Sequence, residues 1–199
     1  MSILVTGGTG YIGSHTVVDL INHGYDVVIV DNYCNSKPEV LNRIQRITNV
    51  RPRFYQVSVQ DEANMRKVFE NERITDVIHF AGLKSVAESV AKPDLYVANN
   101  VGSSRVLLKL MKEYGVYNIV FSSSATVYGV PTHVPLKEDD KVGGCTNPYG
   151  QTKLDIEYML VDYAKENPKA NIAILRYFNP IGAHPTGLIG EDPNGPSLS

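Results

Sequence analysis

Short apolar runs alternate with amphipathic stretches along the chain. The runs are rich in Val, Ile and Phe, as β-strands are, whereas the stretches repeat apolar residues at helical spacing. The runs predict strands at Ile3–Thr6, Asp26–Val30, Arg53–Val57, Asp76–Phe80, Asn118–Ser122 and Ile172–Arg176. The stretches predict helices at Tyr11–Asn22, Pro38–Ile47, Glu62–Asn71, Asp94–Tyr114 and Pro148–Glu166. This alternation predicts an α/β fold with a doubly wound parallel sheet, of the Rossmann type that binds NAD, over residues 1–180.

The composition changes after the last predicted strand. From Pro180 to Ser199 the chain holds four prolines and four glycines. Such a composition is typical of loops, so we interpret residues 181–199 as a loop or linker.

A glycine-rich turn follows the first predicted strand. Gly8, Gly10 and Gly13 satisfy the spacing G-x-G-x-x-G, and Gly7 precedes them. Because glycines lack Cβ atoms, the backbone there can approach a pyrophosphate at the N-terminus of the next helix. The turn has the context that the motif requires, a strand before it and a helix after it, and it predicts a dinucleotide site.

Asp31 follows the second predicted strand, 18 residues after Gly13. An acid in this place hydrogen-bonds the adenosine ribose hydroxyls and repels a 2′-phosphate. The next three residues, Asn32 to Cys34, offer no arginine for such a phosphate, and Lys37 is the one nearby cation. The pattern favours NAD over NADP.

Tyr149 and Lys153 are four residues apart at the start of a predicted helix, which Asn147 would cap and Pro148 would begin. Residues at this spacing share one helix face, so the ammonium can lie beneath the phenol. At about 6 Å and an effective dielectric of about 20, the ammonium favours the phenolate by about 2.8 kcal/mol, which lowers the pKa by about two units. A second cation, such as an oxidised nicotinamide, would bring it nearer neutrality, where a general base works best. The pair therefore predicts a general base that removes the proton of an alcohol.

Bulk properties exclude several classes of function. The chain has 199 residues, a net charge of −2 and a pI of about 6.2, so it lacks the basic surface that nucleic acids or anionic membranes require. Cys34 and Cys145 form no C-x-x-C pair and suit a reducing compartment. No apolar run is long enough to span a membrane, and no signal peptide is seen, so we expect a cytoplasmic enzyme. The histidines show no metal-ligand spacing, and His79 in an apolar run is interpreted as a core residue.

Ser124 follows the fifth predicted strand, and together with Tyr149 and Lys153 it resembles the catalytic group of the short-chain dehydrogenase/reductase superfamily. Within that superfamily the chain resembles the UDP-glucose 4-epimerase family, from Ile3 to about Gly195. The motifs that carry the resemblance are Gly7–Thr16, His79–Lys84, Ser122–Gly129, Asn147–Gly150, Leu175–Pro180, Gly182–Pro185 and Gly190–Pro193.

The resemblance implies a tightly held NAD that is reduced and reoxidised within each turnover. Tyr149 would take the proton from the C4 hydroxyl of a UDP-hexose, and Ser124 would hydrogen-bond that oxygen. Lys153 would hold the nicotinamide ribose and lower the pKa of Tyr149. The 4-keto sugar would then turn over and be reduced on its other face, which interconverts UDP-glucose and UDP-galactose. A homodimer is one oligomeric state that the sequence allows.

The resemblance also implies a set of binding residues. The implied cofactor shell is Gly7, Gly10, Tyr11, Ile12, Gly13, Asp31, Asn32, Tyr33, Cys34, Asn35, Ser36, Ser58, Val59, Phe80, Ala81, Gly82, Leu83, Lys84, Asn99, Tyr149, Lys153 and Phe178. The implied substrate contacts are Lys84, Ser124, Tyr149 and Asn179. Selectivity between UDP-hexoses and UDP-N-acetylhexosamines is not readable from these residues.

Two features depart from the family pattern. Ser58 stands where the family usually has an acid for the adenine amino group, so we expect a lower cofactor affinity, or a substitute such as Asp61 or the backbone. After Gly195 the family continues into a C-terminal substrate lobe, and we expect that lobe to be missing here. Bare apolar faces would then make the chain marginally stable and weaken UDP-sugar binding.

Two other functions compete with the epimerase. A sugar-nucleotide dehydratase would need an acid pair after the serines, where Ala125 and Thr126 stand. A truncated or degenerate NAD-binding module without epimerase activity is the second alternative.

Overall fold

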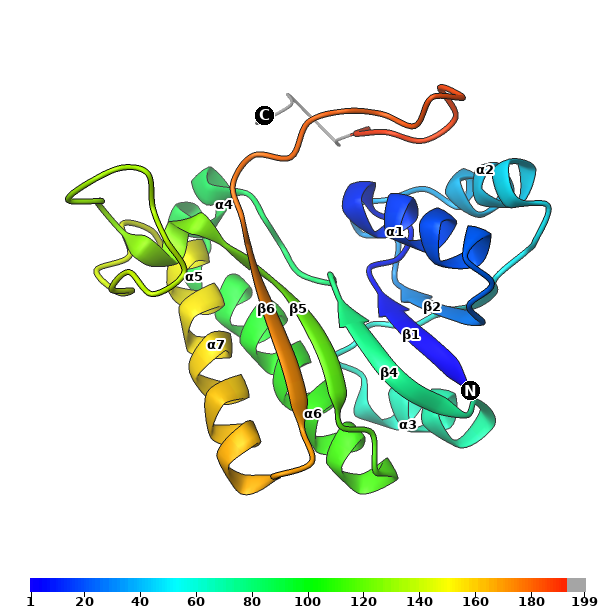
Figure 1. Ribbon diagram of the computed structural model, residues 1–199, viewed down its shortest axis with the longest axis horizontal. Helices are drawn as coiled ribbons and strands as arrows, with labels where there is room; N and C mark the ends of the chain where they lie inside the picture. The colour runs from blue at the N-terminus through cyan, green and yellow to red at the C-terminus, as the bar shows by residue number, and fades with distance from the viewer. Residues whose placement is uncertain (193–199) are drawn as a thin grey trace.

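A single parallel sheet organises the chain. The structure, a computed structural model, describes residues 1–192, so the end of the predicted 181–199 tail, residues 193–199, lies outside the described residues. Six strands pair in the order β3-β2-β1-β4-β5-β6, and every pair is parallel (Figure 1). The strands are β1 (Ser2–Thr6), β2 (Val27–Asp31), β3 (Arg53–Gln56), β4 (Ile74–His79), β5 (Asn118–Ser124) and β6 (Asn171–Tyr177). The predicted doubly wound sheet is confirmed.

Helices cover both faces of this sheet (Figure 1). They are α1 (Tyr11–Asn22), α2 (Glu39–Thr48), α3 (Glu62–Asn71), α4 (Val86–Ala91), α5 (Pro93–Tyr96), α6 (Gly102–Tyr114) and α7 (Pro148–Glu166). A π-helical turn, Val97–Val101, joins α5 to α6, and a 3₁₀ turn, Ala125–Tyr128, follows β5. Among residues 1–192, none of the helices combines the length and the apolar composition that crossing a membrane requires.

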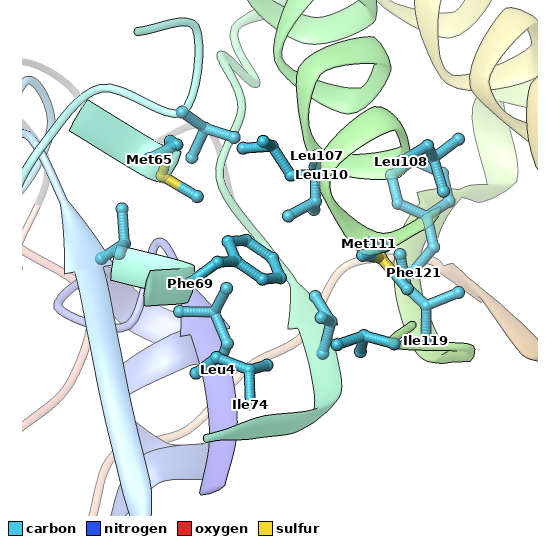
Figure 2. Close-up of a cluster of buried hydrophobic side chains, with 14 of the residues drawn as sticks. Leu4, Met65, Phe69, Ile74, Leu107, Leu108, Leu110, Met111, Ile119 and Phe121 are labelled. Carbon is cyan, nitrogen blue, oxygen red and sulfur yellow. The ribbon is translucent and has the colours of Figure 1, made fainter. Parts of the chain in front are cut away.

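Two apolar cores lie on the two faces. Along β2 the side chains alternate between them, as the period of a strand requires: Val28 and Val30 face one core, and Val27 and Ile29 face the other. The larger core packs α3, α6 and α7 against the sheet. Figure 2 shows Phe69 of α3 and Met111 of α6 among its buried side chains. The smaller core packs α1 and α2 on the opposite face.

The strand order reverses at β1, which pairs with β2 on one side and β4 on the other. Thr6 at the end of β1 is level with Val30 of β2 and with His79 of β4. The loops that leave these strands therefore open at one edge of the sheet. In doubly wound sheets this edge, at the reversal of strand order, is where ligands bind.

Most predicted elements are confirmed, and the bounds of α1, α3 and α7 agree to the residue. The prediction of one helix over Asp94–Tyr114 is wrong, because the π-helical turn Val97–Val101 interrupts it. Within that turn, the side chain of Asn100 bonds to Leu83 and Thr152. These bonds hold the widened turn against its neighbours, and a hydrophobic pattern contains no sign of them.

The helix α4 was not predicted. Its signal is present, since Ser85 and Glu88 have the spacing of a capping box. The Ser85 side chain does accept a hydrogen bond from the backbone N–H of Glu88, at 3.2 Å. The sequence therefore contained enough information to place this helix.

A buried ion pair joins α7 to the edge strand β6. The Glu157 carboxylate accepts two hydrogen bonds from Arg176, at 3.1 and 2.9 Å, and one from the Ser123 hydroxyl of β5, at 2.5 Å. Glu157 is 4% exposed. Arg176 also donates to the hydroxyl of Tyr128, at 2.9 Å, and lies over its ring. The Glu157 carboxylate thus ties a helix to two strands, and Arg176 extends the connection to the 3₁₀ turn.

Substituting Glu157→Gln should lower the free energy of unfolding by about 3 kcal/mol, because it leaves the Arg176 charge without its counterion. Urea denaturation measures this loss. The matched control is Glu166→Gln, which breaks the exposed pair of Glu166 with Lys112, 3.3 Å apart, and should cost less than about 0.5 kcal/mol. Equal losses in the two variants would contradict a special role for the buried pair.

Candidate functional site

A cavity of about 1030 Å³ lies at the carboxyl edge of the sheet. It collects nearly all of the predicted site residues, from turns that are far apart in sequence. These residues are Gly7, Gly10, Tyr11, Ile12, Gly13, Asp31, Asn32, Cys34, Asn35, Ser36, Ser58, Val59, Phe80, Ala81, Gly82, Lys84, Asn99, Ser124, Tyr149, Lys153, Phe178 and Asn179.

Two predicted residues do not line this cavity. Tyr33 turns away and stacks on Phe54 of β3, with 5.0 Å between ring centroids. Leu83 lies behind the lining, where its backbone N–H donates to the side chain of Asn100 at 2.8 Å. Asp61, one of the two substitutes suggested for an acid at Ser58, caps α3, where it accepts from the backbone N–H of Asn64, and is not among the residues that line the cavity.

The glycine-rich turn is packed so closely that side chains would not fit. A Cβ on Gly13 would lie 2.2 Å from the carbonyl oxygen of Gly7, and a Cβ on Gly7 would lie 2.7 Å from the backbone nitrogen of Ala81. Gly7 also has a φ of +69°, which glycine adopts without strain. The turn leads directly into α1, whose first N–H groups have no acceptors within the helix and can bind an anion.

Asp31 ends β2 and is held in place by the turn that follows it. Its carboxylate accepts hydrogen bonds from the backbone of Tyr33 at 2.9 Å, from the backbone of Thr9 at 3.2 Å and from the Ser36 hydroxyl at 3.2 Å. Thr9 also bonds Ser36, at 2.8 Å, and lines the cavity. Sequence reasoning missed Thr9, although it lies inside the glycine motif.

Asn147 and Pro148 begin α7 as predicted, and the Asn147 side chain accepts from the backbone N–H of Gly150 at 2.8 Å. Lys153 lies one turn further along the helix and is 5% exposed. Its ammonium donates to the Ser122 carbonyl at 2.8 Å and lies 5.8 Å from the centre of the Tyr149 ring. Because burial disfavours its charge, the pKa of Lys153 falls to about 8.

The predicted low pKa of Tyr149 is not found in this structure. Burial raises the pKa of the phenol, and hydrogen bonding with Ser124 only partly opposes that rise. The prediction counted the ammonium of Lys153 but left out the cost of removing a phenolate from water. The phenol is therefore protonated at neutral pH unless a further positive charge enters the cavity.

His79 is a core residue, as interpreted from its apolar surroundings. Its ring nitrogens lie 2.6 Å from the Thr6 hydroxyl and 3.0 Å from the Ser104 hydroxyl. Burial lowers its pKa to about 3, so the ring is neutral. Across residues 1–192, no three His, Cys, Asp or Glu side chains gather in a way that could hold a metal ion.

Sequence reasoning also missed Asn100, which connects two walls of the cavity. Its side-chain oxygen accepts from the Leu83 N–H, while its amide group donates to the Leu83 carbonyl at 3.0 Å and to Thr152 at 3.1 Å. The Thr152 hydroxyl in turn donates to the Tyr149 carbonyl at 2.7 Å. Asn100 is 1% exposed, and a buried amide with this many partners holds the loop at Leu83 in a fixed position relative to α7.

Comparison with known proteins identifies close relatives. The chain is 57% identical to the UDP-glucose 4-epimerase of Haemophilus influenzae over 195 residues, and 58% identical to that of Pasteurella multocida over 195 residues. Each match covers 98% of this chain and 58% of the relative. The chain thus spans little more than half the length of the curated relatives it matches.

Solved structures agree with this comparison. The crystal structure of UDP-glucose 4-epimerase from Bifidobacterium longum in complex with NAD+ and UDP superimposes with a TM-score of 0.96 at 53% identity, and the match covers 98% of this chain and 58% of that one. The sequence also matches the family described as NAD dependent epimerase/dehydratase over residues 3–192, which is nearly the whole chain. The chain belongs to the NAD dependent epimerase/dehydratase family.

Proposed function

We propose that the chain binds NAD and carries the catalytic groups of a UDP-hexose 4-epimerase, which interconverts UDP-glucose and UDP-galactose through a 4-keto sugar. One observation carries the proposal: Ser124, Tyr149 and Lys153 line the same cavity as the glycine-rich turn and Asp31. An alcohol base thereby lies beside a dinucleotide site. The names of the close relatives and the NAD+ and UDP bound to the Bifidobacterium longum enzyme support it.

The shape of the cavity fits a dinucleotide. Gly7 and Gly13 let the turn pack more closely than any Cβ would allow, and the N-terminus of α1 that follows provides N–H groups for a pyrophosphate. Asp31 is placed to accept from ribose hydroxyls. When bound, NAD supplies the oxidant and then the reductant of the reaction, and in its oxidised form a positive charge that favours the Tyr149 phenolate.

The chain's own groups handle the proton. In the first half of the reaction the Tyr149 oxygen takes the proton of the sugar C4 hydroxyl, and the Ser124 hydroxyl donates to the same sugar oxygen. In the second half Tyr149 returns the proton to the C4 oxygen. Lys153 holds its ammonium near the Tyr149 ring by donating to the Ser122 carbonyl. Asn179 also lines the cavity and would contact the UDP diphosphate.

We also propose a metabolic role and a cellular compartment for the protein. With UDP-hexoses as substrates it would act in galactose metabolism. Cys34 and Cys145 form no disulfide in the part of the chain that the structure describes, which suits the reducing cytoplasm. A homodimer remains a prediction.

The experiment that tests the proposal is a coupled assay of UDP-galactose conversion to UDP-glucose. Tyr149→Phe removes the proton acceptor and should lower turnover by at least about 100-fold. Tyr158→Phe on the same helix, 51% exposed, is the matched control and should be unchanged. Unchanged turnover in Tyr149→Phe would refute the mechanism. A chain that binds NAD but shows no turnover would favour the alternative of an NAD-binding module.

Gly13→Ala should weaken NAD binding by at least about tenfold, because the new Cβ would displace the Gly7 carbonyl and the backbone around the pyrophosphate site. Isothermal titration calorimetry measures the affinity. Gly102→Ala is the control, since a Cβ there meets nothing within 4 Å. Equal NAD affinity in Gly13→Ala and the unaltered chain would count against the assigned dinucleotide site.

Lys153 should make stability depend on pH in a defined window. Its pKa is lowered from 10.5 to about 8, so between these values the unfolded chain binds the proton and the folded chain does not. The free energy of unfolding therefore gains about 1 kcal/mol per pH unit from this group as the pH rises through the window. Lys153→Met should remove this rise in the free energy of unfolding with pH. Lys165→Met, at an exposed position on the same helix, should retain the rise. Urea denaturation at several pH values compares them, and parallel curves for Lys153→Met and the unaltered chain would disprove the effect.

A further inference from the structure

Residues 181–192 cross the sheet edge at the reversal of strand order. The segment leaves β6 and passes toward α1 and α2 (Figure 1). The Gly182 carbonyl accepts from the hydroxyl of Tyr11 at 2.6 Å, and Ile189 is buried in the core beneath α1 and α2. Near its end, Ile189 to Asp192 line the cavity. The segment, which we call the strap, is therefore a wall of the candidate dinucleotide site.

The strap forms an ion pair or a hydrogen bond with each of the two basic side chains on the α2 side of this cavity. Four basic side chains line the cavity, and Lys37 and Arg43 are the two that lie near Asp31 in sequence. The Lys37 ammonium pairs with the Asp192 carboxylate at 2.6 Å, and the Arg43 guanidinium donates to the Leu188 carbonyl at 3.2 Å. The hydrogen bond and the charge of Lys37, and to a smaller extent the charge of Arg43, lower the pKa of the Asp192 carboxylate.

Lys37 lies next to the expected ribose site. Ser36 donates to the carboxylate of Asp31 at 3.2 Å, and Lys37 is the next residue. In dinucleotide sites of this type, an arginine near the ribose accommodates a 2′-phosphate. The three residues after Asp31 offer no arginine, as the sequence analysis noted. The structure adds Arg43, which reaches the cavity from α2.

We propose that Asp192 is a specificity-determining residue, which keeps the site selective for NAD by neutralising Lys37 and Arg43. Asp31 repels a 2′-phosphate from one side, but two uncompensated cations would attract it from the other. The strap carboxylate removes that attraction and adds a second negative charge. This inference rests on the proposed NAD site and extends it to the discrimination against NADP.

The test measures NAD and NADP affinities by calorimetry on the full chain after removal of bound nucleotide. Asp192→Asn should leave NAD affinity within about twofold and raise NADP affinity about tenfold, the gain expected from one charge-assisted hydrogen bond to the freed cations. Adding Lys37→Ala to Asp192→Asn should remove most of the gain. Both positions are exposed, and equal melting temperatures would show that the variants fold.

Glu191→Gln is the matched control. It removes the neighbouring carboxylate, which pairs with Lys84 at 2.9 Å on the β4 side of the cavity. The ratio of NADP to NAD affinity should stay within about twofold of the unaltered chain, since this substitution breaks the ion pair with Lys84 and keeps the pair of Asp192 with Lys37. An equal change in Glu191→Gln, or an unchanged ratio in Asp192→Asn, would overturn the inference. Failure of the unaltered chain to bind either nucleotide would instead overturn the proposed function.

Discussion

The parallel pairing of β1 with β2 and β4 is the constraint on which the rest of the structure depends. From β1 the chain builds outward to β3 with α1 and α2 on one face, and then from β4 to β6 with α6 and α7 on the other. Connections on opposite faces leave a crevice where they part. Most walls of the candidate site follow from this order, since they are loops that leave the carboxyl ends of strands or turns of helices, such as α2 and α7, that pack beside this edge.

Local sequence patterns predicted the parts of the site that depend on local geometry. The glycine spacing needs only its own turn, and the Tyr149–Lys153 spacing needs only a helix. Because Asn147 and Pro148 mark the start of that helix unambiguously, the shared face of the pair could be predicted as well. The residues that these patterns predict to bind a cofactor or to act in catalysis do meet in one cavity.

The remaining features depend on burial and on contacts between distant segments, which a linear pattern does not contain. The pKa of Tyr149 goes up because the folded chain removes the phenol from water, and nothing in Tyr-x-x-x-Lys encodes that cost. Arg43 reaches the cavity only because α2 packs beside it. Asp192 meets Lys37 across 155 positions of sequence. The Pro- and Gly-rich composition of the strap predicted a loop but not where the loop lies.

The hydrogen bonds of Asn100 couple the position of the loop after β4 to the position of the first turn of α7. One amide holds Leu83, in the loop after β4, and Thr152, whose hydroxyl holds the carbonyl of Tyr149. The loop and the first turn of α7 are therefore not independent bodies. Coupling between two sites is reciprocal, so a ligand that favours one placement of the loop favours the matching placement of Tyr149 by the same free energy. A cofactor bound against the loop would in this way also adjust the placement of Tyr149, the proposed base.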